Sequence, residues 1–258
     1  MRIARFAHQG GMSFGVVEGT ESPIVKELEG HPFGRLTFTG QSWALADVRL
    51  LAPMLPSKIV CVGRNYADHA KELGNDVPDE PLLFLKPSTT IIGPNEAISL
   101  PPQSQQVEHE AELAVVIGLP GARKVGRAEA EQAIFGYTIA NDVTARDLQK
   151  KDVQFTRAKS FDSFCPLGPW IETELANVAD VEVRCEVNDE VRQLGRTKDM
   201  VFDVPTLVSY VSHVMTLLPG DVILTGTPAG VDALRAGDSV TVSIEGIGAL
   251  TNKVVSYE

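Results

Sequence analysis

Cysteine is scarce in this chain, and long apolar runs are missing. The 258 residues include three cysteines, Cys61, Cys165 and Cys185, which cannot all pair and which form no Cys-x-x-Cys motif. This scarcity argues against a disulfide framework and a structural zinc site. No run approaches the roughly 18 apolar residues of a membrane helix, and the first residues lack the apolar core of a signal peptide. We therefore expect a cytoplasmic protein without a membrane partner.

Basic residues are fewer than acidic ones. Lysine and arginine number 23 against 34 aspartates and glutamates, which gives a formal net charge of −11. Because nucleic-acid phosphates bind to basic surfaces, nucleic acid is not expected as the main partner. A local group of Arg and Lys side chains can still form a positive pocket in an acidic protein. An anionic small molecule therefore remains a suitable substrate.

Short apolar, β-branched runs dominate the chain, and helical periodicity is rare. In the first fifty residues we expect strands at 2–7, 13–17 and 36–39. Pro53 and Pro56 then interrupt the pattern. We place a boundary there, between a small N-terminal β-module (residues 1–55) and a main domain (residues 56–258).

The main domain is expected to combine many strands with few, short helices. The strands are expected at 58–62, 82–85, 112–117, 137–140, 181–187, 222–225, 239–244 and 249–255. Asn188 and Asp189 suggest a hairpin turn after the fifth of these. Helices are expected at 65–73, at 128–135 and after Asp203, a capping residue with Pro205 in the first turn. The class is α+β with β-sheet dominant.

Two glutamates stand at the start of a strongly apolar strand. Glu110 and Glu112 are two residues apart, and the run LAVVI (113–117) follows them. Side chains two apart on a strand share a face, so both carboxylates project side by side. Like charges repel there unless a cation or a proton neutralises one, and Mg²⁺ and Mn²⁺ prefer carboxylate oxygens. Two solvated glutamates at a frayed strand end would give the same pattern.

Further polar residues follow the next apolar strand. Asp142 comes directly after it, where enzymes commonly place a ligand, although a turn or a helix cap has the same appearance. Arg146 and Gln149 are three apart and would share a helix face. The planar guanidinium suits a carboxylate, or a surface salt bridge. Lys159 could stabilise an enolate or an oxyanion, although a single lysine in a polar loop is usually only solvated.

A histidine and a glutamate are paired on the helix expected at 65–73. His69 and Glu72 are three apart and are therefore neighbours. A carboxylate beside an imidazole raises its basicity and fixes its tautomer, which gives a general base able to activate water. Gly63 and the polar loop 74–80 would let this helix close as a lid. A solvent-exposed His–Glu pair on an amphipathic helix has the same spacing.

Six ordered motifs together resemble the fumarylacetoacetate hydrolase superfamily, in its bacterial single-domain form. They are CVGRNYADH (61–69), FLKPS (84–88), EHEAEL (108–113), NDVTARDLQ (141–149), AKSFD (158–162) and LPGDVILTGTP (218–228). The resemblance covers residues 57–256. It implies an α+β fold of layered mixed β-sheet with few short helices, commonly a homodimer.

The resemblance also implies a site and a cofactor. The three carboxylates that hold a divalent metal in the family, Mg²⁺ or Mn²⁺, fall on Glu110, Glu112 and Asp142. The catalytic groups of the family fall on His69, Glu72 and Lys159. The substrate contacts of the family fall on Arg64, Arg146, Gln149 and Thr227.

The reactions that the resemblance implies share one intermediate, the enolate of a small 2-oxo acid. The intact His–Glu pair favours a hydrolase that cleaves a carbon–carbon bond in an acylpyruvate such as fumarylpyruvate. The alternatives are an oxaloacetate-type decarboxylase and an isomerase of 2-hydroxyhepta-2,4-diene-1,7-dioate in aromatic catabolism. A non-catalytic protein that binds 2-oxo acids is a further alternative. The motifs do not separate these activities, because one metal–enolate core can support all of the reactions.

Overall fold

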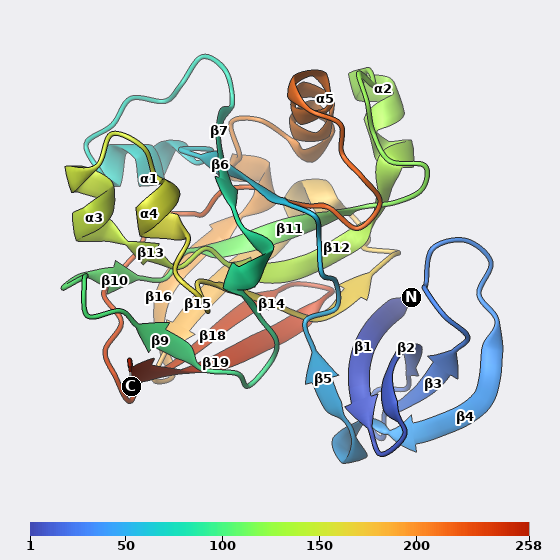
Figure 1. Cartoon of the computed structure of the whole chain (residues 1–258). Helices are drawn as coiled ribbons and strands as arrows, with labels where there is room; N and C mark the ends of the chain where they lie inside the picture. Colours follow the sequence, from blue (N-terminus) through green and yellow to red (C-terminus); the bar gives the residue numbers. More distant parts are fainter. Residues whose placement is uncertain (258) are drawn as a thin grey trace.

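The computed structural model describes residues 1–257 and shows extensive β-sheet with five short α-helices in this range (Figure 1). The strands form a twelve-stranded sheet, a five-stranded sheet and a two-stranded pair. Among the described residues, no helix is long and apolar enough to cross a membrane. The expected α+β class with mixed sheet and few short helices is confirmed.

The elements have the following bounds. The helices are α1 (Ala67–Glu72), α2 (Arg127–Ala130), α3 (Arg146–Lys151), α4 (Thr156–Lys159) and α5 (Val204–Val214). The first strands are β1 (Arg2–His8), β2 (Gly11–Glu18), β3 (Ile24–Leu28), β4 (Phe38–Ala44), β5 (Arg49–Leu51), β6 (Ile59–Gly63), β7 (Leu82–Lys86), β8 (Ile91–Ile92), β9 (Ile98–Leu100) and β10 (Val107–Glu108). The others are β11 (Ala111–Ile117), β12 (Ile134–Asn141), β13 (Thr144–Ala145), β14 (Cys165–Glu172), β15 (Glu182–Val187), β16 (Glu190–Arg196), β17 (Val222–Leu224), β18 (Ser239–Ile244) and β19 (Gly248–Ser256).

Strand β11 lies in the middle of the large sheet. The strand order is β4-β3-β2-β1-β14-β12-β11-β17-β6-β7, so β11 pairs with β12 on one side and with β17 on the other. Every residue of β11 is buried. A strand that is paired at both edges and covered on both faces is expected to be almost wholly apolar. The carboxylate of Glu112 is therefore an exception that needs a specific reason.

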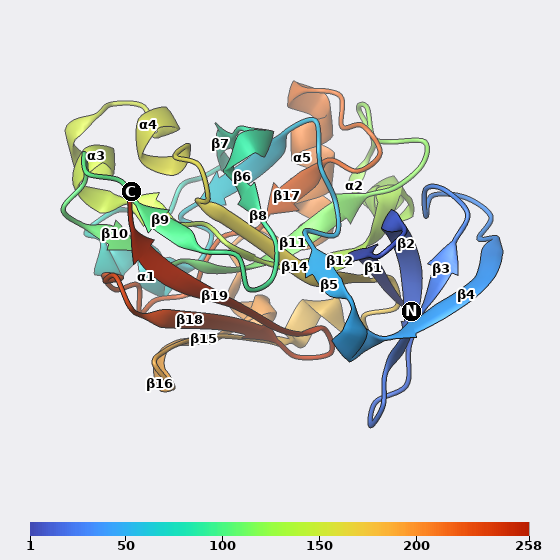
Figure 2. The same cartoon turned by 60° about the horizontal axis from the view of Figure 1, so that its bottom comes forward.

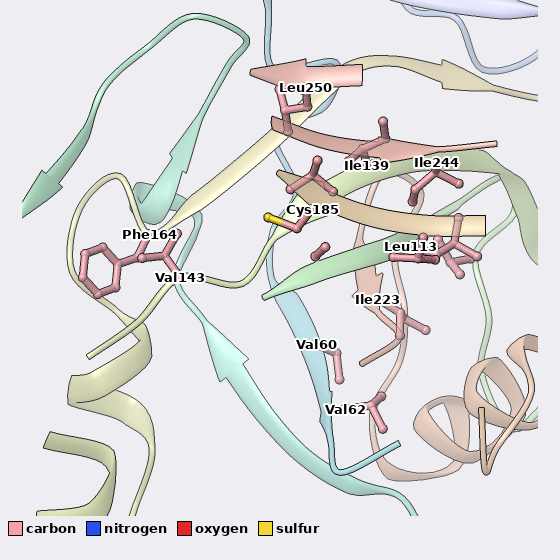
Figure 3. Close-up of a cluster of buried hydrophobic side chains, with 14 of the residues drawn as sticks. Val60, Val62, Leu113, Ile139, Val143, Phe164, Cys185, Ile223, Ile244 and Leu250 are labelled. Atoms are coloured by element: carbon pink, nitrogen blue, oxygen red, sulfur yellow. The ribbon is translucent and has the colours of Figure 1, made fainter. Parts of the chain in front are cut away.

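The five-stranded sheet covers one face of the large sheet. Its order is β16-β15-β18-β19-β9, and Figure 2 shows β15, β16, β18 and β19 beneath the main layer. Leu113, Ile139 and Ile223 of the large sheet and Cys185 and Ile244 of the smaller sheet belong to one buried cluster (Figure 3). Each such side chain contributes on the order of 2 kcal/mol by leaving water. This interface is the main core.

The N-terminal strands continue the large sheet. Strand β1 pairs with β14 through Arg2 and Ile3, so residues of the predicted N-terminal module are hydrogen-bonded to the main sheet. The predictions for this region were incomplete. Strands β3 and β5 were missed, and the strand expected at 36–39 is instead β4, Phe38–Ala44. Nearly all β4 side chains are exposed, so its sequence lacks alternating apolar residues. The boundary near residue 55 stays a prediction.

The helices form two groups. Helices α1, α3 and α4 lie close together at one end of the large sheet, whereas α2 and α5 lie together away from them (Figure 1). Asp203 caps α5 by accepting a hydrogen bond from the Thr206 N–H, as its sequence predicts. The helix expected at 128–135 is too long, because α2 and a following 3₁₀ turn end at Ala133 and Ile134 begins β12.

Candidate active site

Three carboxylates meet where β11 begins and β12 ends. Glu110 directly precedes β11, Glu112 lies within it, and Asp142 directly follows β12. The antiparallel pairing brings these ends together, and the Asp142 N–H donates to the Glu110 carbonyl oxygen over 2.8 Å. One ligand atom from each carboxylate lies within 4.8 Å of the others, and all three residues are buried. The structure therefore brings the three predicted metal ligands together.

Three cations surround these carboxylates. The Lys159 Nζ donates to Glu110 Oε2 over 2.8 Å and to Asp142 Oδ2 over 2.6 Å. Arg146 donates to Glu110 Oε1 over 2.5 Å and to Glu108 Oε2 over 2.7 Å. Lys86, whose side chain is fully buried, donates to the second oxygen of Asp142 over 2.5 Å. Each lysine thus holds a different oxygen of Asp142.

The cations act unequally on the two glutamates. Burial by itself raises the pKa of Glu110, but Lys159 and Arg146 outweigh that effect and lower the pKa. Burial also raises the pKa of Glu112, and the nearby charges of Asp142 and Glu110 raise it further. Glu112 accepts one hydrogen bond, from the Gly226 N–H over 2.6 Å. Of the two glutamates, Glu112 therefore has the larger uncompensated cost of ionisation, which a bound cation would offset.

The donor set fits a hard divalent metal ion. Four buried carboxylates, those of Glu108, Glu110, Glu112 and Asp142, face three cations, so one negative charge is in excess when all four are ionised. A divalent ion would reverse the sign of this excess and favour an anionic ligand beside it. Carboxylate oxygens without sulfur or imidazole in the cluster suit Mg²⁺ or Mn²⁺.

The predicted general base lies on α1. His69 Nδ1 is 3.2 Å from Glu72 Oε2, which confirms that the two side chains are neighbours. The other oxygen of Glu72 accepts a hydrogen bond from the Gly230 N–H over 3.0 Å. A carboxylate accepts and does not donate, so the contact places a proton on His69 Nδ1, and in the neutral imidazole Nε2 is then the nitrogen that can accept a proton.

A cavity that is open to solvent connects this base with the carboxylates. His69 lines the cavity, and so do most of the other residues singled out in the sequence, namely Arg64, Glu110, Glu112, Arg146, Gln149, Lys159 and Thr227. Asp142 lies behind them with no exposed surface. The cavity therefore combines a proton acceptor, buried carboxylates and fixed positive charge.

Two of the residues predicted to contact substrate already form hydrogen bonds within the protein. Arg146 donates to Glu108, to Glu110 and, over 2.6 Å, to Gln149 Oε1. The Thr227 hydroxyl donates to the Ala111 carbonyl oxygen over 2.8 Å, so it can only accept from a ligand. Arg146 thus holds Glu110 in place, and its contact with substrate stays a prediction, as do those of Gln149, Thr227 and Arg64.

Sequence reasoning missed three residues of this network. Lys86 stands in the motif FLKPS, but its contact with Asp142 spans 56 residues of chain. Glu108 precedes the predicted glutamate pair by two residues and, like Glu110, accepts a hydrogen bond from Arg146. Gln193, on β16, accepts from the Ala111 N–H over 3.0 Å and donates to Thr227 Oγ1 over 2.7 Å. The sequence signals available were a lysine directly after the apolar run 82–85 and a third glutamate two residues before Glu110.

Comparison with known proteins agrees with this geometry. Residues 58–255 match the family model described as "Fumarylacetoacetate (FAA) hydrolase C-terminal", and residues 1–53 match "Rv2993c-like, N-terminal". The human mitochondrial protein named oxaloacetate tautomerase FAHD2A is 46% identical, over 81% of this chain and 70% of that protein.

Two solved structures are also similar. One, of a 5-carboxymethyl-2-hydroxymuconate delta-isomerase from Mycobacterium smegmatis, is 53% identical with a TM-score of 0.94, and covers 100% of both chains. The other, of a maleylpyruvate hydrolase from Sphingobium sp. SYK-6 in complex with manganese(II) ion and pyruvate, is 32% identical with a TM-score of 0.81, and covers 100% of both chains. The resemblance found in the sequence is confirmed, and the chain belongs to the fumarylacetoacetate hydrolase family of enzymes.

Proposed function

We propose that this chain moves a proton within a small 2-oxo acid, interconverting keto and enol forms or shifting a conjugated double bond. The observation that carries the proposal is a tautomer-fixed histidine, His69, on the same cavity as the carboxylate cluster. Relatives that are 46% and 53% identical are named a tautomerase and an isomerase, which supports the same reaction class.

The carboxylates Glu110, Glu112 and Asp142 would hold Mg²⁺ or Mn²⁺. When bound, such a cation withdraws electron density from the keto oxygen of the substrate and so favours the enolate. The manganese ion and pyruvate in the related hydrolase support this assignment. The substrate we propose is a small 2-oxo acid, whose carboxylate offsets the positive charge added by the cation.

His69 would act as the general base. Its Nε2 accepts a proton from the carbon next to the keto group, and the electron pair of that C–H bond forms the carbon–carbon double bond of the enolate. The proton then returns to the enolate oxygen, which gives the enol, or to a more distant carbon of a conjugated chain, which gives an isomer. Glu72 keeps the Nδ1 proton in place throughout.

Lys159 would stabilise the negative charge that develops on the substrate. Two of the three protons on its Nζ are used by Glu110 and Asp142, so one N–H is left for a substrate oxygen. Burial lowers the pKa of Lys159, but Asp142 and Glu110 outweigh that effect and raise it. The ammonium therefore stays charged and contributes electrostatically, not as a base.

Hydrolysis of an acylpyruvate, the activity favoured by the sequence, is the second candidate. The same His69 Nε2 could deprotonate a water molecule that attacks the distal carbonyl carbon, after which the carbon–carbon bond breaks and leaves the pyruvate enolate. The related maleylpyruvate hydrolase supports this possibility, at the lower identity of 32%. Decarboxylation of oxaloacetate is the third reaction of the enolate and needs no base.

A substrate panel separates the candidates. Enol absorbance of oxaloacetate reports tautomerisation, and pyruvate release from fumarylpyruvate, acetylpyruvate and oxaloacetate reports hydrolysis or decarboxylation. We expect accelerated tautomerisation with Mn²⁺ or Mg²⁺ and its loss with EDTA. His69→Ala should lower the rate by about 10²–10⁴-fold, whereas His213→Ala, at an exposed histidine on α5, should not. Acceleration of hydrolysis alone would establish the second candidate, and turnover in EDTA would refute the metal assignment.

The assembly is a separate proposal. The family resemblance favours a homodimer, and the fold leaves several large apolar side chains exposed, among them Val153 and Leu194. Light scattering coupled to size-exclusion chromatography should give twice the chain mass of 27.8 kDa. A single-chain mass over a range of concentrations would contradict the dimer.

A further inference from the structure

The carboxylate of Glu72 is held by a loop far from it in sequence. Its Oε1 accepts the Gly230 N–H over 3.0 Å, while its Oε2 faces His69 Nδ1 over 3.2 Å. We propose that Gly230 is a positioning residue, whose backbone N–H latches α1 in the orientation that makes His69 a base. The inference rests on the proposed function, because it assigns His69–Glu72 the proton transfer.

Helix α1 needs such a contact because it is short. It has six residues, and its Ncap residue makes no side-chain capping bond. The Glu72 side chain keeps 32% of its surface exposed, and its hydrogen-bonding contacts are those with His69 and the Gly230 N–H. With one oxygen on a backbone N–H, the other oxygen is directed at the imidazole. One hydrogen bond from outside the helix thus fixes both the carboxylate and the histidine tautomer.

The position of the Gly230 N–H is itself tightly determined. Gly230 has φ +103°, and a Cβ there would lie 2.1 Å from the Arg192 carbonyl oxygen on β16. Neither the backbone angle nor the available space admits a side chain. The preceding residues are tied to the same strand, because the Gln193 Nε2 donates to the Pro228 carbonyl oxygen over 2.7 Å.

Gln193 also connects this loop to the carboxylate cluster. It is fully buried and uses both ends of its amide. Its Oε1 accepts from the Ala111 N–H and faces His109 Nδ1 over 2.9 Å, while its Nε2 donates to Thr227 Oγ1 and to Pro228. Strand β16 therefore aligns two parts of the site at once, the start of β11 and the loop that holds Glu72.

A pair of glycine variants tests the latch. Gly230→Ala should force the loop away from Arg192 and lower kcat for proton transfer by about tenfold, with KM changed less, since orientation and not binding is lost. Gly237→Ala is the matched control, because Gly237 has φ +99° and no atom within 4 Å of an added Cβ. It bears the same backbone strain without the clash. Equal effects of both variants on kcat would overturn the proposal.

A double-mutant cycle shows whether Gly230 acts through Glu72. Glu72→Ala removes the acceptor, so Gly230→Ala should lower kcat no further in that background. Independent, multiplicative losses would mean that Gly230 has only a general structural role.

Hydrogen exchange tests the latch without any assay of activity. The Ala70 N–H and the Leu73 N–H are bonded within α1, to Tyr66 and His69. These amides should exchange faster in Glu72→Ala but not in Glu72→Gln, which keeps an oxygen for Gly230. This comparison remains available if Gly230→Ala does not fold or if no substrate is found. Unchanged exchange in Glu72→Ala would refute the latch and leave the proposed function standing.

Discussion

Lys86→Met should destabilise the protein strongly. Its ammonium lies 2.5 Å from Asp142 Oδ1 and 3.1 Å from the Val143 carbonyl oxygen, with no exposed side-chain surface. Methionine fills a similar volume but leaves Asp142 with Lys159 as its one cationic partner. Removing one member of a buried ion pair costs about 3–5 kcal/mol. At about 2–4 °C per kcal/mol for a chain of this size, the melting temperature should fall by roughly 6–20 °C.

The matched control is Lys58→Met. Lys58 also pairs with a buried aspartate, Asp221, but its own side chain keeps 22% of its surface exposed. Asp221 retains other donors, including the Ser57 hydroxyl at 2.6 Å and the Leu218 N–H at 2.7 Å. Lys58→Met should therefore lower the free energy of unfolding by only about 1 kcal/mol. Thermal and urea unfolding of both metal-free variants give the comparison, and equal losses would refute the reasoning that burial of the pair sets the cost.

Three further predictions concern carboxylate side chains. Glu112→Gln should remove the stabilisation that Mn²⁺ gives the wild type, about 2.7 kcal/mol at a hundred times Kd. In metal-free protein the raised pKa of Glu112 means that the folded state binds more protons than the unfolded state. The free energy of unfolding should therefore fall as pH rises above about 4.3 in the wild type, and fall less in Glu112→Gln. The same dependence of the melting temperature on pH in both proteins would contradict this. Asp203→Ala should cost about 1 kcal/mol by removing the cap on the Thr206 N–H, and Asp203→Asn clearly less.

Local patterns predicted part of this structure. The alternation around Glu112 correctly placed Glu110 beside it, and the sequence around Asp203 correctly predicted a capped helix, because both signals depend on neighbouring residues. The Lys86–Asp142 pair was not predictable in this way, since it depends on how β7 packs against the end of β12. Strand β4 was misplaced because its exposed side chains give no periodic signal.

The candidate site could be predicted as a set of residues but not as a network. The motifs named the three carboxylates and the His69–Glu72 pair, and the structure gathers them at one site, whose cavity is lined by His69, Glu110 and Glu112. The contacts that occupy Arg146 and Thr227 were not foreseeable, because Gln193 lies outside every motif and Glu108, although it begins the motif EHEAEL, was given no role. Which donors and acceptors of a side chain already have partners depends on the folded structure and cannot be read from the sequence.

The cations around Asp142 have a consequence for how the enzyme matures. Lys86, Lys159 and Arg146 neutralise most of the carboxylate charge from within the chain. The polypeptide therefore carries its own counterions and can complete folding before a divalent ion arrives, unlike small zinc domains that collapse only around their metal. If the proposed divalent ion binds there, its loading would be an exchange at a folded site, where the ion competes with the Lys159 ammonium group for carboxylate oxygens. Metal supply would then set the fraction of loaded molecules, while the folded state forms without the ion and is stabilised further by it.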